Sequence, residues 1–332
     1  MFPVLAAVGS GWRGPSTMQS VFDAQVAPAS AGRGARGDRV RNTLTIAAFL
    51  SPAIIVYVLF VIYPMVRAIW FSLYDWNGLG PMDDFVGWQN FEKVLSDRVF
   101  QMAIQHNLTL VVLSLVIQLP IALGIALLIR DSIPGRAAFR TIFFLPYVLS
   151  EVVTGVVWVF IFRPQNGLLN WVAGGLIPGF EPVALLADTG TVLYAIFAVI
   201  TWKFFGFHMI LYLAGLQGIP PELEEAARVD GATSGEVLRH ITLPLLGPTI
   251  RISIFFSVLG SLQFFDLIWI MTKGGPVDAS NTMATYMYTA GFTRFQLGYG
   301  AAVSLVIFAI CFVFSILYQR FVMRRDLEGA LT

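Results

Sequence analysis

Aromatic rings and planar polar side chains occur together in two apolar stretches of this sequence. The seven residues are Trp202, Lys203, Phe205, Gln263, Phe264, Asp266 and Trp269. Aromatic faces pack on the C–H surfaces of sugars, and planar polar groups replace the hydrogen bonds that sugar hydroxyls lose on leaving water. On a helix Gln263 and Asp266, three positions apart, lie on neighbouring faces and can reach one cavity. The chemistry that these residues favour is therefore the binding of a carbohydrate.

Two of these residues, Lys203 and Asp266, carry charge inside apolar runs. Ionisable side chains in such runs face a bundle interior, a wet cavity or each other. A structural or gating ion pair between Lys203 and Asp266 is one prediction, and direct sugar contact is the alternative. The aromatic residues are equally well explained as packing residues. His208 is expected to be a hydrogen-bonded interior histidine and Glu151 to lie at a cavity wall, and no ligand cluster predicts a metal site.

The composition indicates which elements must position these residues. The chain has 332 residues, of which 57% are hydrophobic and 12% charged, and its mean hydropathy is +0.74. These values predict an all-α polytopic membrane protein. Six stretches reach the roughly 20 apolar residues of a membrane span, and each must be helical because a bilayer offers the backbone no other partners. The predicted spans are 44–66, 103–129, 139–162, 192–216, 249–272 and 299–321.

The distribution of basic residues orients this six-helix bundle. Six spans place both termini on one side, where the exposed segments contain 14 Lys and Arg against six on the other side. By the positive-inside rule both termini are cytoplasmic, in the plasma membrane. Residues 1–42 are predicted to be a disordered tail, followed by a transmembrane domain at 43–325 and a second tail at 326–332. The first residues lack a signal-peptide pattern, so no cleavage is expected, and Met18 is an alternative start to Met1.

Small residues form a stripe on the predicted fifth span, where Ser253, Ser257 and Ser261 recur every four positions. Further small residues, Gly298 and Gly300 among them, open the sixth span. Such stripes allow helices to approach closely. Both groups are expected to contact a second subunit.

A polar hairpin at residues 217–248 interrupts the apolar chain. Pro220 and Pro221 suit the first turn of a short helix, and the acids that follow them favour its positive end. The dipeptide at 230–231 predicts a turn. Thr233 and Glu236 then form the pattern of a capping box that opens a second short helix, which a Leu-Pro step disturbs. The sequence therefore predicts a helix–turn–helix that projects from the membrane.

This hairpin closely resembles the Glu-Ala-Ala loop of permease subunits of ABC importers. That loop has a glycine four residues after its last alanine and Ile-x-Leu-Pro downstream. The matching region here contains Glu225, Ala226, Ala227, Asp230, Gly231, Ile241, Leu243 and Pro244. In that family the hairpin is a coupling helix that sits in a groove of a separate ATPase subunit. The resemblance implies that residues 217–248 are a cytoplasmic coupling loop, although an ordinary amphipathic loop is the alternative for so short a motif.

Other stretches resemble the carbohydrate-uptake branch of these permeases, the maltose and glycerol-phosphate type. They include Tyr63-Pro64 in the first span, Trp202-Lys203 in the fourth, and Gly274, Gly275 and Pro276 in the last outer loop. Two departures accompany them. Val237 stands where a larger aromatic residue is common, and the third loop lacks the large insertion of the maltose transporter.

The resemblance implies a set of partners and a mechanism. The partners are two copies of an ATPase that binds Mg-ATP, a second homologous permease, an extracellular solute-binding protein and membrane lipid. The substrate is a carbohydrate, with a neutral di- or oligosaccharide favoured, imported by alternating access. The chain itself is expected to need no cofactor. Which sugar it carries, and whether the permeases form a homodimer or a heterodimer, stay open.

Several activities find no support in the sequence. It contains no Gly-x-x-x-x-Gly-Lys phosphate loop, Gly-x-Ser-x-Gly elbow or His-Glu-x-x-His helix, so it is not expected to be an enzyme. A net charge of +1 gives no nucleic-acid signal. An ion- or proton-coupled secondary transporter is the rival interpretation, motivated by Lys203, Asp266 and Glu151. A structural membrane scaffold is a third, but it leaves the hairpin unexplained.

Overall fold

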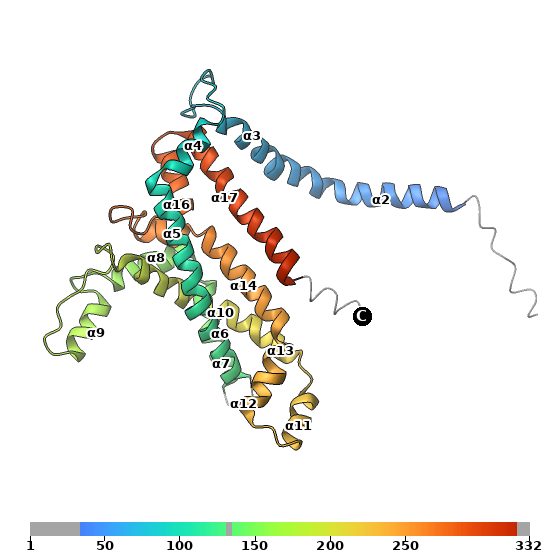
Figure 1. Ribbon diagram of the computed structural model, residues 1–332, viewed down its shortest axis with the longest axis vertical. Helices are drawn as coiled ribbons and strands as arrows, with labels where there is room; N and C mark the ends of the chain where they lie inside the picture. Colours follow the sequence, from blue (N-terminus) through green and yellow to red (C-terminus); the bar gives the residue numbers. More distant parts are fainter. Residues whose placement is uncertain (1–33, 131–134, 324–332) are drawn as a thin grey trace, which may run out of the picture. The chain divides into compact units, whose positions relative to one another are not determined.

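The computed structural model describes residues 34–130 and 135–323 (Figure 1). Residues 1–33, 131–134 and 324–332 lie outside this description, and so do most of the predicted tail at 1–42 and all of the predicted tail at 326–332. The chain divides into two units, Met1–Pro64 and Met65–Thr332. Each unit is described separately.

The first unit contains α2 (Gly34–Tyr57), a π-helical turn (Val58–Ile62) and the first two residues of α3 (Tyr63–Ser72), whose remaining residues belong to the second unit. The apolar helical stretch Asn42–Ser72 is long enough to cross a membrane. Because α2 begins at Gly34, residues 34–42 are helical and the predicted boundary of the disordered tail is wrong. A helix extends cheaply once it has been nucleated, since each added residue gains one backbone hydrogen bond.

The described residues of the second unit form helices joined by loops, and their one β feature is an isolated bridge between Tyr74 and Phe85. Its helices are α4 (Gln89–Ser96), α5 (Arg98–Leu113), α6 (Leu119–Ile129), α7 (Arg136–Val148), α8 (Glu151–Ile161), α9 (Leu168–Leu176), α10 (Val192–Gln217), α11 (Pro221–Val229), α12 (Ser234–Val237), α13 (Leu243–Leu245), α14 (Gly247–Leu262), α15 (Asp266–Met271), α16 (Met283–Tyr288) and α17 (Leu297–Tyr318). The predicted all-α class is confirmed.

Five helical segments of the described chain are long and apolar enough to be spans. They are Asn42–Ser72, Arg98–Ile129, Val192–Gln217, Gly247–Met271 and Leu297–Met323. The third predicted span, 139–162, is not one helix, because α7 and α8 are bent by 96° at a short break. The predicted count of six holds only if this bent pair is one span.

The most buried span is α10, which packs against α6, α7 and α14. Apolar residues of α10 contribute to two of the hydrophobic clusters of the second unit. Gly206 permits the closest of these approaches, since a Cβ at this position would overlap the carbonyl oxygen of Phe143 in α7. The helix that carries the predicted residues Trp202, Lys203 and Phe205 is therefore fixed at the centre of the unit.

Three prolines explain three of the π-helical turns. The turns at Val58–Ile62, Ser114–Gln118 and Leu238–Thr242 each end two residues before a proline. These prolines are Pro64, Pro120 and Pro244. A proline has no N–H to donate, and its ring crowds the preceding turn, so a widened turn lets the helix continue. The Leu-Pro step in the coupling loop therefore widens the second short helix and does not end it.

The break between α7 and α8 is stabilised by Lys203, which is 1% exposed. Its ammonium group donates to the carbonyl oxygens of Pro146, Tyr147 and Leu149 at 3.3, 3.4 and 2.5 Å. It also lies 3.6 Å from a carboxylate oxygen of Glu151, at the start of α8. A cation at a helix C-terminus bonds the free carbonyls and interacts favourably with the negative end of the helix dipole. Lys203 thus satisfies backbone groups that have no water to bond at membrane depth.

The predicted ion pair between Lys203 and Asp266 is therefore wrong. Lys203 pairs with Glu151, while Asp266 is exposed and occupies the first position of α15. A carboxylate is stabilised at that position by the positive end of the helix dipole.

A second break separates α14 from α15 and depends on Asn107, a fully buried residue of α5. The Asn107 amide donates to the carbonyl oxygens of Ser261 and Leu262 at 2.6 and 3.2 Å, and its oxygen accepts from the backbone N–H of Met283 at 2.9 Å. Because the helix ends at Leu262 and restarts at Asp266, Gln263 and Asp266 do not share a helix. The face that was predicted from their spacing does not exist.

The small residues also have partners other than those predicted. Ser253 bonds His208 at 2.8 Å, and Ser261 bonds Ser114 at 3.4 Å. Gly300 lies close to the backbone of Gly291. Ser253, Ser261 and Gly300 therefore bring helices of the same chain together, and the contact with a second subunit stays a prediction.

Replacing Asn107 with leucine is expected to destabilise the second unit. Two carbonyl groups and one N–H would lose their partner, and a buried unpaired polar group costs about 1–3 kcal/mol. We expect Asn107→Leu to lower the unfolding temperature of the detergent-purified protein clearly. Gln105→Leu, an exposed change on the same helix, is the matched control. Equal melting of the two variants would contradict this role for Asn107.

Candidate coupling loop and substrate cavity

The coupling loop, residues 217–248, begins with α11. Pro220 precedes this helix and Pro221 is its first residue, while Glu222 and Glu224 lie in its first turn. The positive end of the helix favours both acids. The helix ends at Asp230, and Gly231 follows with a φ of 91°, a left-handed conformation that glycine adopts without strain. The predicted first helix and its glycine turn are confirmed.

A capping box opens the second helix of the loop, as the sequence predicts. The Thr233 side chain accepts from the backbone N–H of Glu236 at 3.4 Å, and the Glu236 carboxylate accepts from the backbone N–H of Thr233 at 2.8 Å. The bonds that this carboxylate accepts from the backbone N–H and the hydroxyl of Thr233 hold the pKa of Glu236 below its ordinary value. Since α12 continues through the π-helical turn into α13, the second arm reaches Leu245.

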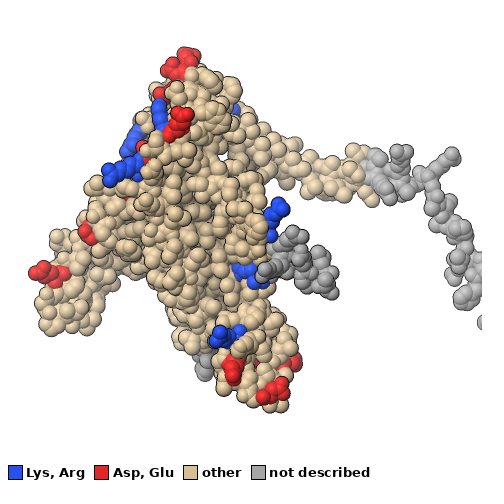
Figure 2. Space-filling view, in the orientation of Figure 1, with Lys and Arg blue, Asp and Glu red and all other residues tan. Residues whose placement is uncertain are grey.

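The outer surface of the coupling loop contains most of the residues that match the family motif. Glu225, Ala226, Asp230, Gly231 and Pro244 are exposed. Ala227, Ile241 and Leu243 are half-buried. Two apolar side chains, Leu223 and Val229, are also exposed on α11. Figure 2 shows acidic side chains together with basic ones at this end of the unit, so the loop offers a surface of mixed apolar and charged character.

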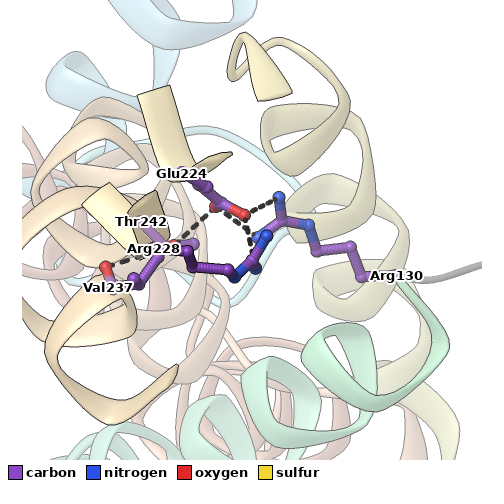
Figure 3. Close-up of polar contacts among 5 residues, drawn as sticks. All are labelled: Arg130, Glu224, Arg228, Val237 and Thr242. Atoms are coloured by element: carbon purple, nitrogen blue, oxygen red, sulfur yellow. Dashed lines mark hydrogen bonds and ion pairs between the residues drawn. The ribbon is translucent and has the colours of Figure 1, made fainter. Parts of the chain in front are cut away.

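On the inner side of the coupling loop lies a buried carboxylate, Glu224, whose role sequence reasoning missed (Figure 3). Arg130 donates to one of its oxygens at 2.7 Å and lies 2.7 Å from the other. Thr242 donates to the carboxylate at 2.7 Å, and Arg228 lies 3.5 Å away. The i,i+4 spacing of Glu224 and Arg228 was visible in the sequence. Arg130, 94 positions from Glu224, gave no such signal.

This network keeps Glu224 ionised. Burial alone would raise its pKa, but hydrogen bonds from Arg130 and Thr242, together with the charges of Arg130 and Arg228, outweigh burial. The pKa of Glu224 therefore lies below its ordinary value. The stabilisation that the network provides is present at neutral pH and is lost only as the pH falls through this lowered pKa.

A cavity of about 370 Å³ lies between the two helix breaks. Tyr147, at the end of α7, and Ser261 and Phe264, at the end of α14 and in the break after it, contribute to its wall. The complete lining is Ser114, Gln118, Tyr147, Ile200, Phe204, Phe207, His208, Phe256, Ser257, Gly260, Ser261 and Phe264. This lining combines aromatic rings with hydroxyl and amide groups, and it contains no Asp, Glu, Lys or Arg.

Two polar residues of the lining differ in their bonding. His208 is buried and bonds Ser253 at 2.8 Å, which confirms the predicted hydrogen-bonded interior histidine. The Ser257 hydroxyl is buried and has no hydrogen-bond partner among the described residues. A buried hydroxyl without a partner is free to bond a ligand.

The structure brings only one of the seven sequence candidates, Phe264, into this cavity. Lys203 lies at the α7–α8 break with Glu151, and Gln263 and Asp266 are exposed. The remaining three are packed against other aromatic rings. Trp202 contacts Trp158, Phe205 contacts Phe143, and Trp269 contacts Phe265 and Tyr288.

The loop between α15 and α16, which the sequence predicts to be an outer loop, has a defined conformation. Gly274 has a φ of 87°, and the Gly275–Pro276 peptide is cis. Ser280 donates to the carbonyl oxygen of Gly275 at 2.6 Å and bonds Thr272 at 2.8 Å. These bonds hold the predicted residues Gly274, Gly275 and Pro276 at the end of α15.

Several known proteins resemble this chain in sequence. A probable ABC transporter permease protein of Pyrococcus horikoshii is 35% identical over 269 residues, 81% of this chain and 92% of the relative. The diacetylchitobiose uptake system permease protein NgcF of Streptomyces coelicolor is 31% identical, covering 91% of this chain and 90% of the relative. The trehalose/maltose transport system permease protein MalF of Thermococcus litoralis is 32% identical, with coverage of 82% and 91%.

Solved structures share the fold. A chain of a bacterial ABC transporter involved in the import of the acidic polysaccharide alginate superposes with a TM-score of 0.75 at 26% identity, covering 86% of this chain and 98% of that chain. The bacterial alginate transporter in complex with an alginate pentasaccharide-bound periplasmic protein gives a TM-score of 0.76 at 25% identity, with coverage of 86% and 96%.

A family match agrees with these similarities and with the membrane-spanning helices. Residues 118–326 match the family described as the binding-protein-dependent transport system inner membrane component. The matched region includes the cavity, apart from Ser114, and the whole coupling loop. The chain belongs to this family of inner membrane transport components.

Proposed function

We propose that this chain is the permease subunit of an ABC importer that carries a neutral di- or oligosaccharide across the plasma membrane. The observation that supports this substrate class best is the cavity lined by aromatic rings, serines and Gln118. Aromatic faces and uncharged hydrogen-bonding groups suit a sugar, whereas an anionic substrate needs fixed positive charge along its path. The relatives named for diacetylchitobiose and for trehalose and maltose favour the same class.

The energy for transport is supplied in this proposal by a separate ATPase. Two ATPase subunits, each with Mg-ATP, dock on the exposed motif residues of two permeases, and this chain offers Glu225, Ala227 and Gly231. A second homologous permease completes the membrane part, and an extracellular solute-binding protein delivers the sugar. Both termini lie in the cytoplasm, on the side of the coupling loop. ATP binding then favours one orientation of the cavity because the ATPase contacts the two states differently.

The observations that motivated an ion-coupled transporter have another explanation. Lys203 and Glu151 stabilise the break between α7 and α8. Asp266 is exposed at the start of α15. None of the three is needed as an ion carrier, so the ABC importer is the function that the geometry supports best.

We expect Gly231→Val to uncouple transport. A valine Cβ finds no neighbour within 4 Å at this position, but the φ of 91° is strained for a β-branched residue. Strain of about 1–3 kcal/mol disturbs the turn and lowers ATP-driven uptake by about tenfold, while insertion is unchanged. The measurement is sugar uptake into proteoliposomes that contain the complete transporter.

Gly235→Val is the matched control for this turn. Gly235 also has open space at its Cβ, but it lies in α12 and its φ is not positive. Uptake by this variant should stay close to wild type. Full uptake by Gly231→Val would refute the role of the turn.

Ser257→Ala is expected to weaken sugar binding in the cavity. The loss of one hydrogen bond of about 0.5–1.5 kcal/mol corresponds to a two- to tenfold rise in the dissociation constant. Equilibrium dialysis of labelled sugar against the purified complex, without its binding protein, measures this constant directly. Ser315→Ala, whose hydroxyl bonds the carbonyl of Cys311 in its own helix, should bind as wild type does. Unchanged binding by Ser257→Ala would place the sugar elsewhere.

A further inference from the structure

The attachment of α11 to the rest of the unit includes one buried side chain. In α11, which the structure describes in full, Glu224 is the one buried residue and is 4% exposed. The larger apolar residues of this helix, Leu223 and Val229, are exposed, and Ala227 is half-buried. A short helix in a protein is normally held by an apolar face. A buried carboxylate takes that place here.

The carboxylate of Glu224 joins three separate segments of the chain (Figure 3). Arg130 directly follows α6, the second half of a membrane span, and pairs with both carboxylate oxygens at 2.7 Å. Thr242 ends the π-helical turn that leads through α13 into α14, and it is 1% exposed. The network therefore connects α11 to the cytoplasmic ends of two different spans.

The geometry of this contact resists bending and sliding. Two parallel bonds between a guanidinium and a carboxylate fix the relative orientation of both groups, which a single charge contact does not. Thr242 constrains the carboxylate further from the other arm of the loop. Arg228, one turn along α11 and 3.5 Å from the carboxylate, is half exposed and contributes less.

The adjacent acid, Glu225, lies on a different face of the helix and is exposed. Successive residues of a helix point about 100° apart, so one acid faces the bundle and the next faces outward. In the proposed transporter the outward acid belongs to the ATPase contact. The inward acid belongs to the connection between that contact and the membrane.

We infer that Glu224, held by Arg130 and Thr242, is a positioning residue that makes the coupling loop move as one body with α6 and α14. This inference rests on the proposed function, because it concerns how motion of an ATPase reaches the spans. Without the network α11 is attached mainly by its two ends. The loop then moves with the ATPase while α6 and α14 stay in place. The cavity would then change its orientation less often for each ATP hydrolysed.

The test is a charge exchange in the complete transporter, reconstituted in proteoliposomes with its binding protein. Arg130→Gln and Glu224→Gln are each expected to lower sugar uptake per ATP hydrolysed by about tenfold, a coupling effect of ordinary size between two sites. The ATPase should still co-purify with both variants. The exchange Arg130→Glu with Glu224→Arg should restore much of the coupling, because the pair is re-formed with its direction reversed.

Two further variants separate this role from a general effect of charge or folding. Glu222→Gln removes an exposed acid from the same turn of α11 and should couple as wild type does. Thr242→Val keeps the Arg130–Glu224 pair and should lower coupling only in part, so it serves if the charge variants fail to fold. Hydrogen exchange in α11 should become faster in Arg130→Gln.

The outcomes are distinguishable. Wild-type coupling in Arg130→Gln, Glu224→Gln and Thr242→Val would overturn the inference and leave the proposed function intact. Failure of the wild-type chain to co-purify with any ATPase would overturn the proposed function and this role with it. Loss of coupling in the single variants, with recovery in the exchanged pair, would establish Glu224 as the connection.

Discussion

Where a helix is interrupted inside a membrane, the backbone groups at the break lose their helical hydrogen bonds and need other partners from the protein. The architecture of the second unit depends on this constraint. Lys203 supplies donors at the α7–α8 break, and Asn107 supplies them at the α14–α15 break. Each side chain comes from a different span and bonds at least two carbonyl oxygens. Without them the freed carbonyls would be unsatisfied at a depth where water is absent. The two polar residues on α10 and α5 therefore stabilise both breaks.

The breaks also explain where a cavity can form. Continuous helices pack side by side and their side chains fill the space between them. An interrupted helix changes direction at the break, so the space beside the break is not filled in this way. Three residues beside the breaks line the cavity. Tyr147 lies in the last turn of α7, and Ser261 and Phe264 lie at the end of α14 and in the break that follows it. The helices beyond the breaks, α8 and α15, pack closely: the absence of a side chain at Gly155 leaves room for Ile270, which a Cβ at this position would crowd. The cavity wall thus takes its shape from two interruptions that hydrogen bonds stabilise.

Sequence reasoning identified those features that depend on neighbouring residues. The spans follow from local hydropathy, and the α11 turn and the capping box at Thr233 follow from residue spacing within a few positions. The predicted ion pair between Lys203 and Asp266 was wrong. A one-dimensional pattern cannot show that the fifth span is interrupted between Gln263 and Asp266. The cavity residues Ser114 and Gln118 were missed for a similar reason. Their polar character becomes informative only when the π-helical turn at Ser114–Gln118 is seen to meet α14.

Glu224 and Glu225 show the same limit at the level of one helix turn. In sequence they are two adjacent acids at the positive end of a short helix, and the family motif begins at the second. In the structure the first is buried against Arg130, 94 residues away, and the second is exposed. A buried carboxylate is stable only where its charge is matched and its oxygens are bonded, so the position of Arg130 at the end of α6 is as necessary as the acid itself. The two adjacent acids therefore have different positions: Glu224 attaches α11 to the bundle, and Glu225 lies on the outer surface of the loop.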